Sequence, residues 1–241
     1  GYPGRIFLNN GNSEFIMKYQ PSFLGDKNFE DMGVLFIDVD EDGDLDLFVA
    51  SGGVECVPGS SLLLDRVYLN DGLGNFTKGH SSLMPDIRTS SSVVAAADID
   101  LDGTQEIFIG GRVVPGKYPL SPNSFIIKKI GSNYSDATTK LAPEIKNAGM
   151  VTSAIFSDVD IDGWPDLLVT YEWGPVRFFY NDSGFLYDRT ADVDMAERLG
   201  WFNSISGGDI DNDGDIDFVL GNTGYNTKYK ATADNPEILF Y

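Results

Sequence analysis

The chain has 241 residues, of which 42% are hydrophobic and 12% aromatic, enough to bury a substantial core in a folded protein. Its 17 Lys and Arg face 37 Asp and Glu, and the formal net charge of −20 would repel nucleic acid and anionic lipid surfaces. No run approaches the roughly 18 apolar residues of a membrane span. We therefore expect no nucleic-acid partner and no membrane insertion. The single Cys56 also excludes an internal disulfide framework.

The first predicted element is a hairpin in the opening segment GYPGRIFLNNGNSEF. Similar hairpins recur later as RVYLN followed by DGLGNF and as VRFFYN followed by DSGFLYD. In the first of these, the Asn-Asp-Gly at residues 70–72 supplies the positive φ values that a tight turn needs. We interpret residues 1–30 as the outer hairpin of a preceding unit with its linker, and we expect the chain to be a mature or excised piece of a longer protein.

A nine-residue acidic pattern recurs four times along the chain. The copies are DVDEDGDLD, DIDLDGTQE, DVDIDGWPD and DIDNDGDID, which begin at residues 38, 98, 158 and 209 and so lie 60, 60 and 51 residues apart. Each copy follows a small or apolar run and precedes an alternating run, both typical of strands. The pattern predicts one β-domain with repeats at 31–90, 91–148 and 149–201 and an incomplete repeat at 202–241. The final ILFY, at 238–241, fits either the third strand of the fourth repeat or the first strand of a fifth.

The acidic pattern places oxygen ligands at alternate positions of a tight loop, as a hard divalent cation requires. Position 6 is always a glycine, which permits a sharp turn. Positions 1, 3 and 5 are always aspartate: Asp38, Asp40, Asp42, Asp98, Asp100, Asp102, Asp158, Asp160, Asp162, Asp209, Asp211 and Asp213. Position 7 is expected to offer a backbone carbonyl, from Asp44, Thr104, Trp164 and Asp215. Position 9 is expected to close the shell, with Asp46, Glu106, Asp166 and Asp217.

Calcium, at about four sites, is the predicted ion because it takes six to eight oxygens in flexible geometry; magnesium retains waters and is the second choice. An EF-hand is excluded because its Glu at position 12 is replaced by Val49, Ile109, Val169 and Leu220. We expect the second site to be the weakest, since Thr104 removes a nearby charge and Glu106 is one methylene longer than Asp. The alternative, that Asp and Gly merely favour turns, explains one copy but not four at this spacing.

The repeats resemble the FG-GAP and VCBS-type repeats, through the D-x-D-x-D-G-x-x-D loop that follows an apolar strand. This resemblance implies an all-β fold, a β-propeller or partial propeller of about four four-stranded blades with calcium loops between the first and second strands. The Phe-Gly and Gly-Ala-Pro signatures of integrin α-subunit propellers are not evident, so the chain is more similar to the bacterial VCBS-like branch, including proteins with ASPIC/UnbV regions. The segments GGRVVPGKYP and GNTGYNTKYKA also resemble long loops of that branch.

Repeated loops without catalytic asymmetry predict a binding or scaffold module for a protein or glycan ligand, and not an enzyme. Calcium sites of extracellular modules have Kd values of about 10⁻⁴–10⁻³ M, too weak for cytosolic calcium, which favours a secreted, cell-surface or periplasmic location. Further blades of the parent chain, or self-association, are possible partners. One alternative is a carbohydrate-active enzyme domain, a polysaccharide lyase or hydrolase with paired acids. A structural spacer is another. The only histidine, His80, is expected in an exposed loop.

In propellers of this type, the connections after the second strand of each blade emerge on the face opposite the metal loops. Here these connections hold much of the scarce positive charge together with aromatic residues, which suits an anionic or carbohydrate-bearing ligand. The predicted ligand-binding residues are Arg112, Lys117, Tyr118, Tyr171, Trp173, Arg177, Tyr225, Lys228, Tyr229 and Lys230. The alternative is that these are solvated loops whose aromatic residues pack locally, with Trp173 and Trp201 as blade-packing residues.

Overall fold

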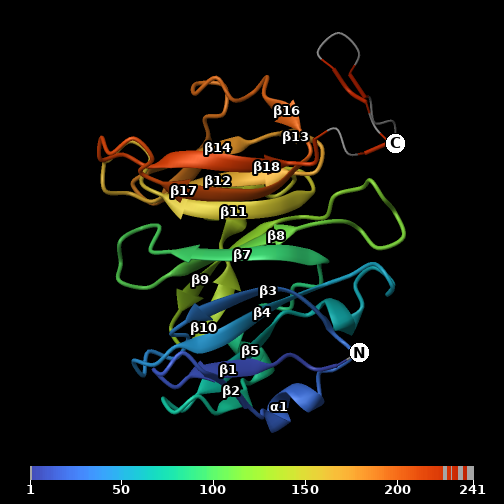
Figure 1. Cartoon of the computed structure of the whole chain (residues 1–241), viewed down its shortest axis with the longest axis vertical. Coiled ribbons are helices and arrows are strands. Elements are labelled where there is room, and N and C mark those ends of the chain that lie inside the picture. Colours follow the sequence, from blue (N-terminus) through green and yellow to red (C-terminus); the bar gives the residue numbers. More distant parts are fainter. Residues whose placement is uncertain (1, 225–226, 229, 233–235, 238–241) are drawn as a thin grey trace.

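A computed structural model describes residues 2–224, 227–228, 230–232 and 236–237. Antiparallel strands form several sheets, and helices are confined to single turns, so the predicted all-β class is confirmed (Figure 1). The helical turns of the described residues are α1 (Pro21–Leu24), α2 (Thr138–Leu141), η1 (Ser61–Leu63), η2 (Ser81–Leu83) and η3 (Pro143–Ile145). In that part of the chain, no helix has the length and hydrophobicity to cross a membrane.

Among the described residues, three sheets have four strands each, paired antiparallel in the order in which they follow along the chain. The first sheet contains β3 (Glu30–Ile37), β4 (Asp46–Gly52), β5 (Arg66–Asn70) and β6 (Phe76–Lys78). The second contains β7 (Ser91–Ala97), β8 (Glu106–Gly111), β9 (Phe125–Ile130) and β10 (Asn133–Asp136). The third contains β11 (Val151–Ser157), β12 (Asp166–Tyr171), β14 (Arg177–Asp182) and β15 (Phe185–Asp188). Each sheet is therefore one copy of the same β unit.

The two ends of the described chain form strand pairs instead of complete sheets. The pairs are β1 (Ile6–Asn9) with β2 (Phe15–Lys18), and β17 (Phe202–Gly208) with β18 (Asp217–Asn222). A short pair, β13 (Gly174–Pro175) with β16 (Leu199–Gly200), links the connections around the third sheet. The segment 238–241, predicted as a strand, lies outside the described residues. By sequence, β1–β2 corresponds to the outer half of a unit and β17–β18 to the inner half.

The second strand of each complete sheet is buried on both faces. All residues of β4, β8 and β12 are buried, because alternate side chains enter the two different cores on either side of the strand. In β8, Ile107 and Ile109 pack in the core shared with the first sheet, and Phe108 packs in the core shared with the third. Burial of each such side chain contributes roughly 1.5–3 kcal/mol, so the stacked sheets stabilise one another.

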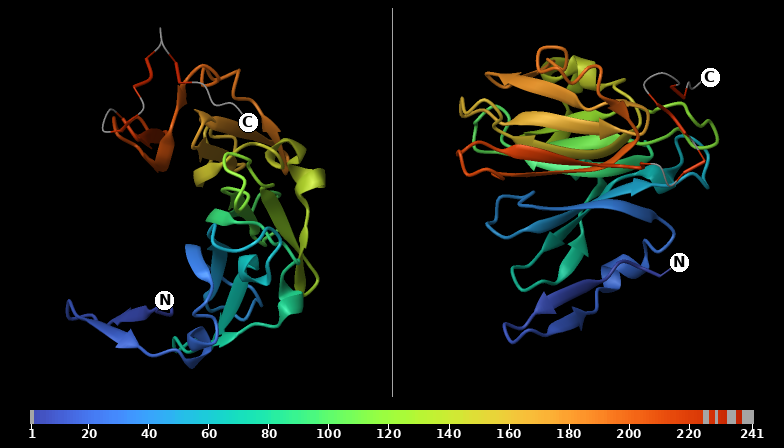
Figure 2. Two further views of the ribbon diagram at one scale, coloured as in Figure 1. Left: turned by 90° about the vertical axis from the view of Figure 1, so that its right-hand side faces the viewer. Right: turned by 45° about the horizontal axis from the view of Figure 1, so that its top comes forward.

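The first strands of successive sheets pack against one another, β3 on β7, β7 on β11 and β11 on β17. Small residues allow this close approach: a Cβ on Gly33 would lie 3.3 Å from the carbonyl oxygen of Ser92, and the Ser92 hydroxyl donates to the carbonyl of Val151 at 2.7 Å. The sheets follow a curved path whose two ends lie apart (Figure 2). The four first strands run the same way, so the acidic loops gather at one end, the left of Figure 1.

Candidate metal centres

The four acidic loops connect first and second strands and share one backbone conformation. Their fourth residues have positive φ: Glu41 (64°), Leu101 (53°), Ile161 (61°) and Asn212 (64°). Their glycines at position 6 also have positive φ: Gly43 (93°), Gly103 (92°), Gly163 (93°) and Gly214 (100°). Left-handed backbone is unfavourable for leucine and for β-branched isoleucine, so Leu101 and Ile161 must be held there by contacts elsewhere in the loop.

The first aspartate of each loop makes such contacts. In the third loop, the Asp158 carboxylate accepts the backbone N–H of Asp162 at 3.0 Å and that of Gly163 at 2.9 Å. Asp162 in turn accepts the N–H of Trp164 at 2.8 Å. The equivalent first aspartates, each bonded to its own glycine N–H, are Asp38, Asp98 and Asp209. These bonds orient the carboxylates while leaving further lone pairs available to a ligand.

Position 9 begins the second strand and ties the loop to the rest of the sheet. The residues at this position with fully buried side chains are Asp46, Glu106 and Asp166. Asp166 accepts the N–H of Val159 at 3.0 Å and the N–H of Asn181, on the third strand, at 2.7 Å. Asp46 makes the same two kinds of bond in the first loop. Burial raises the pKa of Asp166 to about 6, although both N–H donors act to lower it.

Three acids of each loop bring one carboxylate oxygen apiece to within 4.8 Å of one another. The groups are Asp38, Asp40 and Asp42; Asp98, Asp100 and Glu106; Asp158, Asp160 and Asp166; and Asp209, Asp211 and Asp217. Burial and then the charges of Asp46 and Asp42 raise the pKa of Asp40. In the fourth loop, the charge of Asp213 and then burial raise the pKa of Asp215. A divalent cation between these oxygens would relieve the repulsion.

Asp44, at position 7 of the first loop, adds a second indication of a ligand. Its Oδ1 atom is buried and has no hydrogen-bond partner among the described residues, although buried polar atoms are normally paired. An all-oxygen donor set with an orphaned carboxylate oxygen fits a hard cation such as calcium. The backbone carbonyls expected to bind at position 7 stay a prediction.

A family model described as the FG-GAP-like repeat matches residues 158–220. The match begins at the first aspartate of the third acidic loop and ends in β18, beyond the fourth loop. This part of the chain is similar to FG-GAP-type repeats. A search of the curated proteins found no match. The two acidic loops that precede the matched segment, at 38–46 and 98–106, have the same positive-φ pattern and the same place between strands.

The second acidic loop differs from the others in one respect that the sequence analysis missed. Lys128, from the third strand β9, inserts its ammonium group among the acids at positions 3, 5 and 9. The third strands, written one above another as RVYLN, FIIKK and RFFYN, do contain the signal. Only the middle one has a lysine where the others have leucine and tyrosine.

The long connections of these repeats lie at the end opposite the acidic loops, where several predicted ligand residues meet. Arg112 forms an ion pair with the buried Glu172, and the Tyr118 hydroxyl donates to the other oxygen of Glu172 at 2.8 Å. The Trp173 indole N–H donates to Tyr118 at 2.8 Å, and the Trp173 and Trp201 rings are 4.9 Å apart. We call these five residues the aromatic cluster. Glu172 was not singled out from the sequence, because a lone glutamate in a loop carries no distinguishing pattern.

The other predicted ligand residues are placed separately. Tyr171 is 2% exposed and belongs to the core between the second and third sheets, and Arg177 lies over its ring and pairs with Asp188 at 3.3 Å. Lys117, Lys228 and Lys230 are all exposed, whereas Tyr225 and Tyr229 lie outside the described residues. His80 is exposed and its ring accepts the N–H of Ser82, in keeping with the loop position predicted for it.

Proposed function

We propose that the chain is a calcium-stabilised binding or scaffold module, built of β-propeller blades, that acts outside the cytoplasm and catalyses no reaction. The observation that carries the proposal is the recurrence of one acidic loop conformation at the same end of successive sheets. An ion held there would join positions 1 and 3, which follow the first strand, to position 9, which begins the second. Calcium would then fasten the two inner strands of a blade together.

The proposed ion also accounts for the unusual charge of the chain. A net charge of −20 destabilises a compact fold by self-repulsion, and bound divalent cations reduce it where the acids are densest. An ion that binds only the folded state stabilises it by RT ln(1 + [L]/Kd), about 2.7 kcal/mol when the free ion exceeds Kd a hundredfold. Exposed loops of this kind are expected to bind at about 10⁻⁴–10⁻³ M, which supports an extracytoplasmic location.

A propeller arrangement is supported by the packing of first strands on first strands along the curved path in Figure 2. In a propeller the first strand of each blade lies nearest the axis, and neighbouring blades stack face to face. The curve would continue at both ends, because β1–β2 lacks an inner pair and the described part of β17–β18 lacks an outer pair. We propose that the parent chain or a second copy completes these blades.

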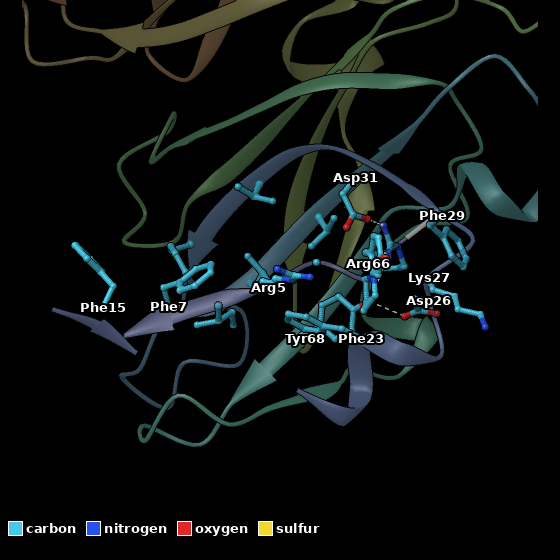
Figure 3. Close-up of a pocket in the computed structure, with 18 residues that line it drawn as sticks. Arg5, Phe7, Phe15, Phe23, Asp26, Lys27, Phe29, Asp31, Arg66 and Tyr68 are labelled. Carbon is cyan, nitrogen blue, oxygen red and sulfur yellow. Dashed lines mark hydrogen bonds and ion pairs between the residues drawn. The ribbon is translucent and has the colours of Figure 1, made fainter. Parts of the chain in front are cut away.

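A pocket of about 370 Å³ between β1 and the first sheet supports this view of the N-terminal end (Figure 3). Among the residues that line it, Arg66 pairs with Asp31, and the Tyr68 hydroxyl donates to Asp26 at 2.6 Å. Apolar residues are left exposed at its rim, including Val34 at 64% and Phe36 at 55%. These two residues lie on β3, the first strand of the first sheet, where the inner strands of a preceding blade would pack.

The aromatic cluster is the proposed ligand-binding surface. Because Glu172 already neutralises Arg112, the cluster presents ring surface more than positive charge, and Tyr118 is 53% exposed. Aromatic rings beside hydrogen-bonding groups suit a glycan, or an aromatic or apolar side chain of a protein ligand. The proposed ligand is accordingly a glycan or protein that stacks on these rings, and an anionic group is not required.

Arrays of glycans and of proteins, probed with the intact chain in calcium and in EGTA, test this function. We expect a specific hit in calcium that Tyr118→Ala and Trp201→Ala weaken at least severalfold. Tyr19→Ala is the matched control, since Tyr19 is an exposed tyrosine in the N-terminal part of the chain. Product release in the same wells would contradict the non-catalytic role, and equal binding by all three folded variants would remove the aromatic cluster as the site.

A further inference from the structure

A lysine ammonium occupies the centre of the second acidic loop. The Nζ atom of Lys128 is 2.8 and 2.7 Å from the two carboxylate oxygens of Asp100, 2.8 Å from Asp102 and 2.7 Å from Glu106. The lysine side chain is only 18% exposed. Asp100 and Glu106 are two of the three acids whose oxygens gather in this loop, so the ammonium group binds the oxygens that a metal ion would use.

Strand register shows that the lysine is particular to this repeat. Where the second strand pairs with the third, the three sheets align Leu47 with Tyr68, Ile107 with Ile127 and Leu167 with Phe179. Lys128 directly follows Ile127, so its counterparts are Leu69 in the first sheet and Tyr180 in the third. Neither counterpart carries a positive charge. The adjacent Lys129 points to the other face of the strand, where its ammonium group is 2.9 Å from Glu41 of the first loop.

Glu106 completes the arrangement around the lysine. One of its oxygens accepts the N–H of Ile99 at 2.8 Å, as the aspartates at position 9 do in the other loops. Its other oxygen accepts from Lys128, whereas Asp46 and Asp166 use their second oxygen for a backbone N–H on the third strand. The additional methylene of glutamate therefore brings its carboxylate to the ammonium group.

The ion pairs keep the lysine charged. Burial acts to lower the pKa of Lys128, but the hydrogen bonds that its ammonium group donates to Asp100, Asp102 and Glu106 outweigh burial and raise that pKa. The hydrogen bond from Lys128, followed by that from Thr104, lowers the pKa of Asp102 to about 2. Calcium would have to approach the same oxygens to about 2.3–2.6 Å, so ammonium and calcium cannot both be bound. Displacing Lys128 would leave a half-buried cation without its three acids.

We infer that Lys128 replaces calcium in the second loop, so that the chain binds three ions at its four acidic loops. This inference rests on the proposed calcium binding of the other three loops. Among the described residues, the second sheet is then the one complete sheet whose acidic loop holds a cation supplied by the chain itself.

Metal content after equilibrium dialysis against calcium tests the inference on the intact chain. We expect three ions per chain in the wild type, four in Lys128→Leu, which has the side chain of Leu69, and two in Leu69→Lys. Lys129→Leu is the matched control for loss of a neighbouring lysine and should keep three. Asp100→Ala should also keep three, whereas Asp160→Ala should lose one. Circular dichroism checks that each variant is folded. If Lys128→Leu does not fold, Lys128→Met takes its place.

The outcomes separate this inference from the proposal on which it rests. Four ions in the wild type, or a count that neither Lys128→Leu nor Lys128→Met raises, would overturn the role of Lys128 and leave calcium binding intact. Loss of an ion in Asp100→Ala would likewise overturn it. A wild type that binds no calcium would overturn the proposed function itself.

Discussion

The second and third acidic loops have nearly the same backbone but different means of neutralising their acids. Position 4 has φ 53° in one and 61° in the other, and the glycines have φ 92° and 93°. Asp98 accepts the N–H of Gly103 and Asp158 accepts the N–H of the equivalent Gly163, each at 2.9 Å. In the second loop a lysine from the third strand lies among the carboxylates, whereas the third loop has only Tyr180, whose hydroxyl is 3.3 Å from Asp162.

This comparison shows that loop conformation alone does not identify a metal site. Hydrogen bonds within each loop orient the carboxylates inward in both cases, so the loop motif is satisfied whether or not a metal binds. A side chain more than 20 residues away in the sequence, at one register position of β9, supplies the cation in one case. The third strand must therefore be read together with the loop.

The largest expected effect is on stability, from truncating the buried acid at position 9. Asp166→Ala leaves the buried N–H groups of Val159 and Asn181 without their acceptor, at roughly 1–3 kcal/mol each, and also removes a calcium ligand. Urea unfolding should show the larger loss in calcium and a smaller one in EGTA. Glu106→Ala is the paired variant, and its loss should be the same in both conditions. A calcium-dependent loss in Glu106→Ala would break the distinction between the loops.

A smaller effect is expected from removing the lysine. Lys128→Leu leaves Asp100, Asp102 and Glu106 to repel one another, so in EGTA it should destabilise the chain by roughly 1–3 kcal/mol. Millimolar calcium should restore most of this loss, because the vacated oxygens can then bind the ion. Tyr180→Leu in the third loop serves as the control and should show no comparable rescue. If calcium fails to restore the stability of Lys128→Leu, the second and third loops differ in calcium binding by more than this one residue.

The smallest effect concerns local opening and is read from amide hydrogen exchange. Gly103 and Gly163 donate equivalent N–H groups to the first aspartates of their loops. If calcium adds about 1.4 kcal/mol to the local stability of the third loop, EGTA should speed exchange at Gly163 about tenfold. Exchange at Gly103 should change little. Equal acceleration at both glycines would contradict the inference that only the third loop depends on calcium.

The strands and the acidic loops were predictable because their signals are local. Apolar runs before each loop and alternating runs after it correspond to β7 and β8 and their counterparts, and Gly163 and its equivalents take the positive φ expected at position 6. The two-stranded sheets at both ends of the described chain also follow from the sequence pattern, since each corresponds to half of a repeat. Closure and the number of blades do not, because they depend on how neighbouring units pack.

The contacts that distinguish one repeat from another were not predictable from local patterns. Lys128 reaches the second loop only because Ile127 pairs with Ile107, a register that the sequence FIIKKI does not reveal by itself. Likewise, Glu172 joins Arg112 to Tyr118 across two connections that are about 60 residues apart in sequence. Tyr171 was expected at the ligand surface as part of the connection after the second strand, yet it is still in β12, where strand alternation directs its ring into the core.

The central claim, that calcium bound by the acidic loops stabilises these sheets, is tested most directly by urea unfolding of the wild-type chain in millimolar calcium and in excess EGTA. Magnesium at the same concentration is the control for non-specific charge screening. The predicted result is a stabilisation by calcium of about 0.4–1.4 kcal/mol for each site, because millimolar calcium is about one to ten times the expected Kd, with a smaller effect of magnesium. Coincident unfolding curves in calcium and EGTA, with no calcium found by elemental analysis of the folded protein, would contradict the claim.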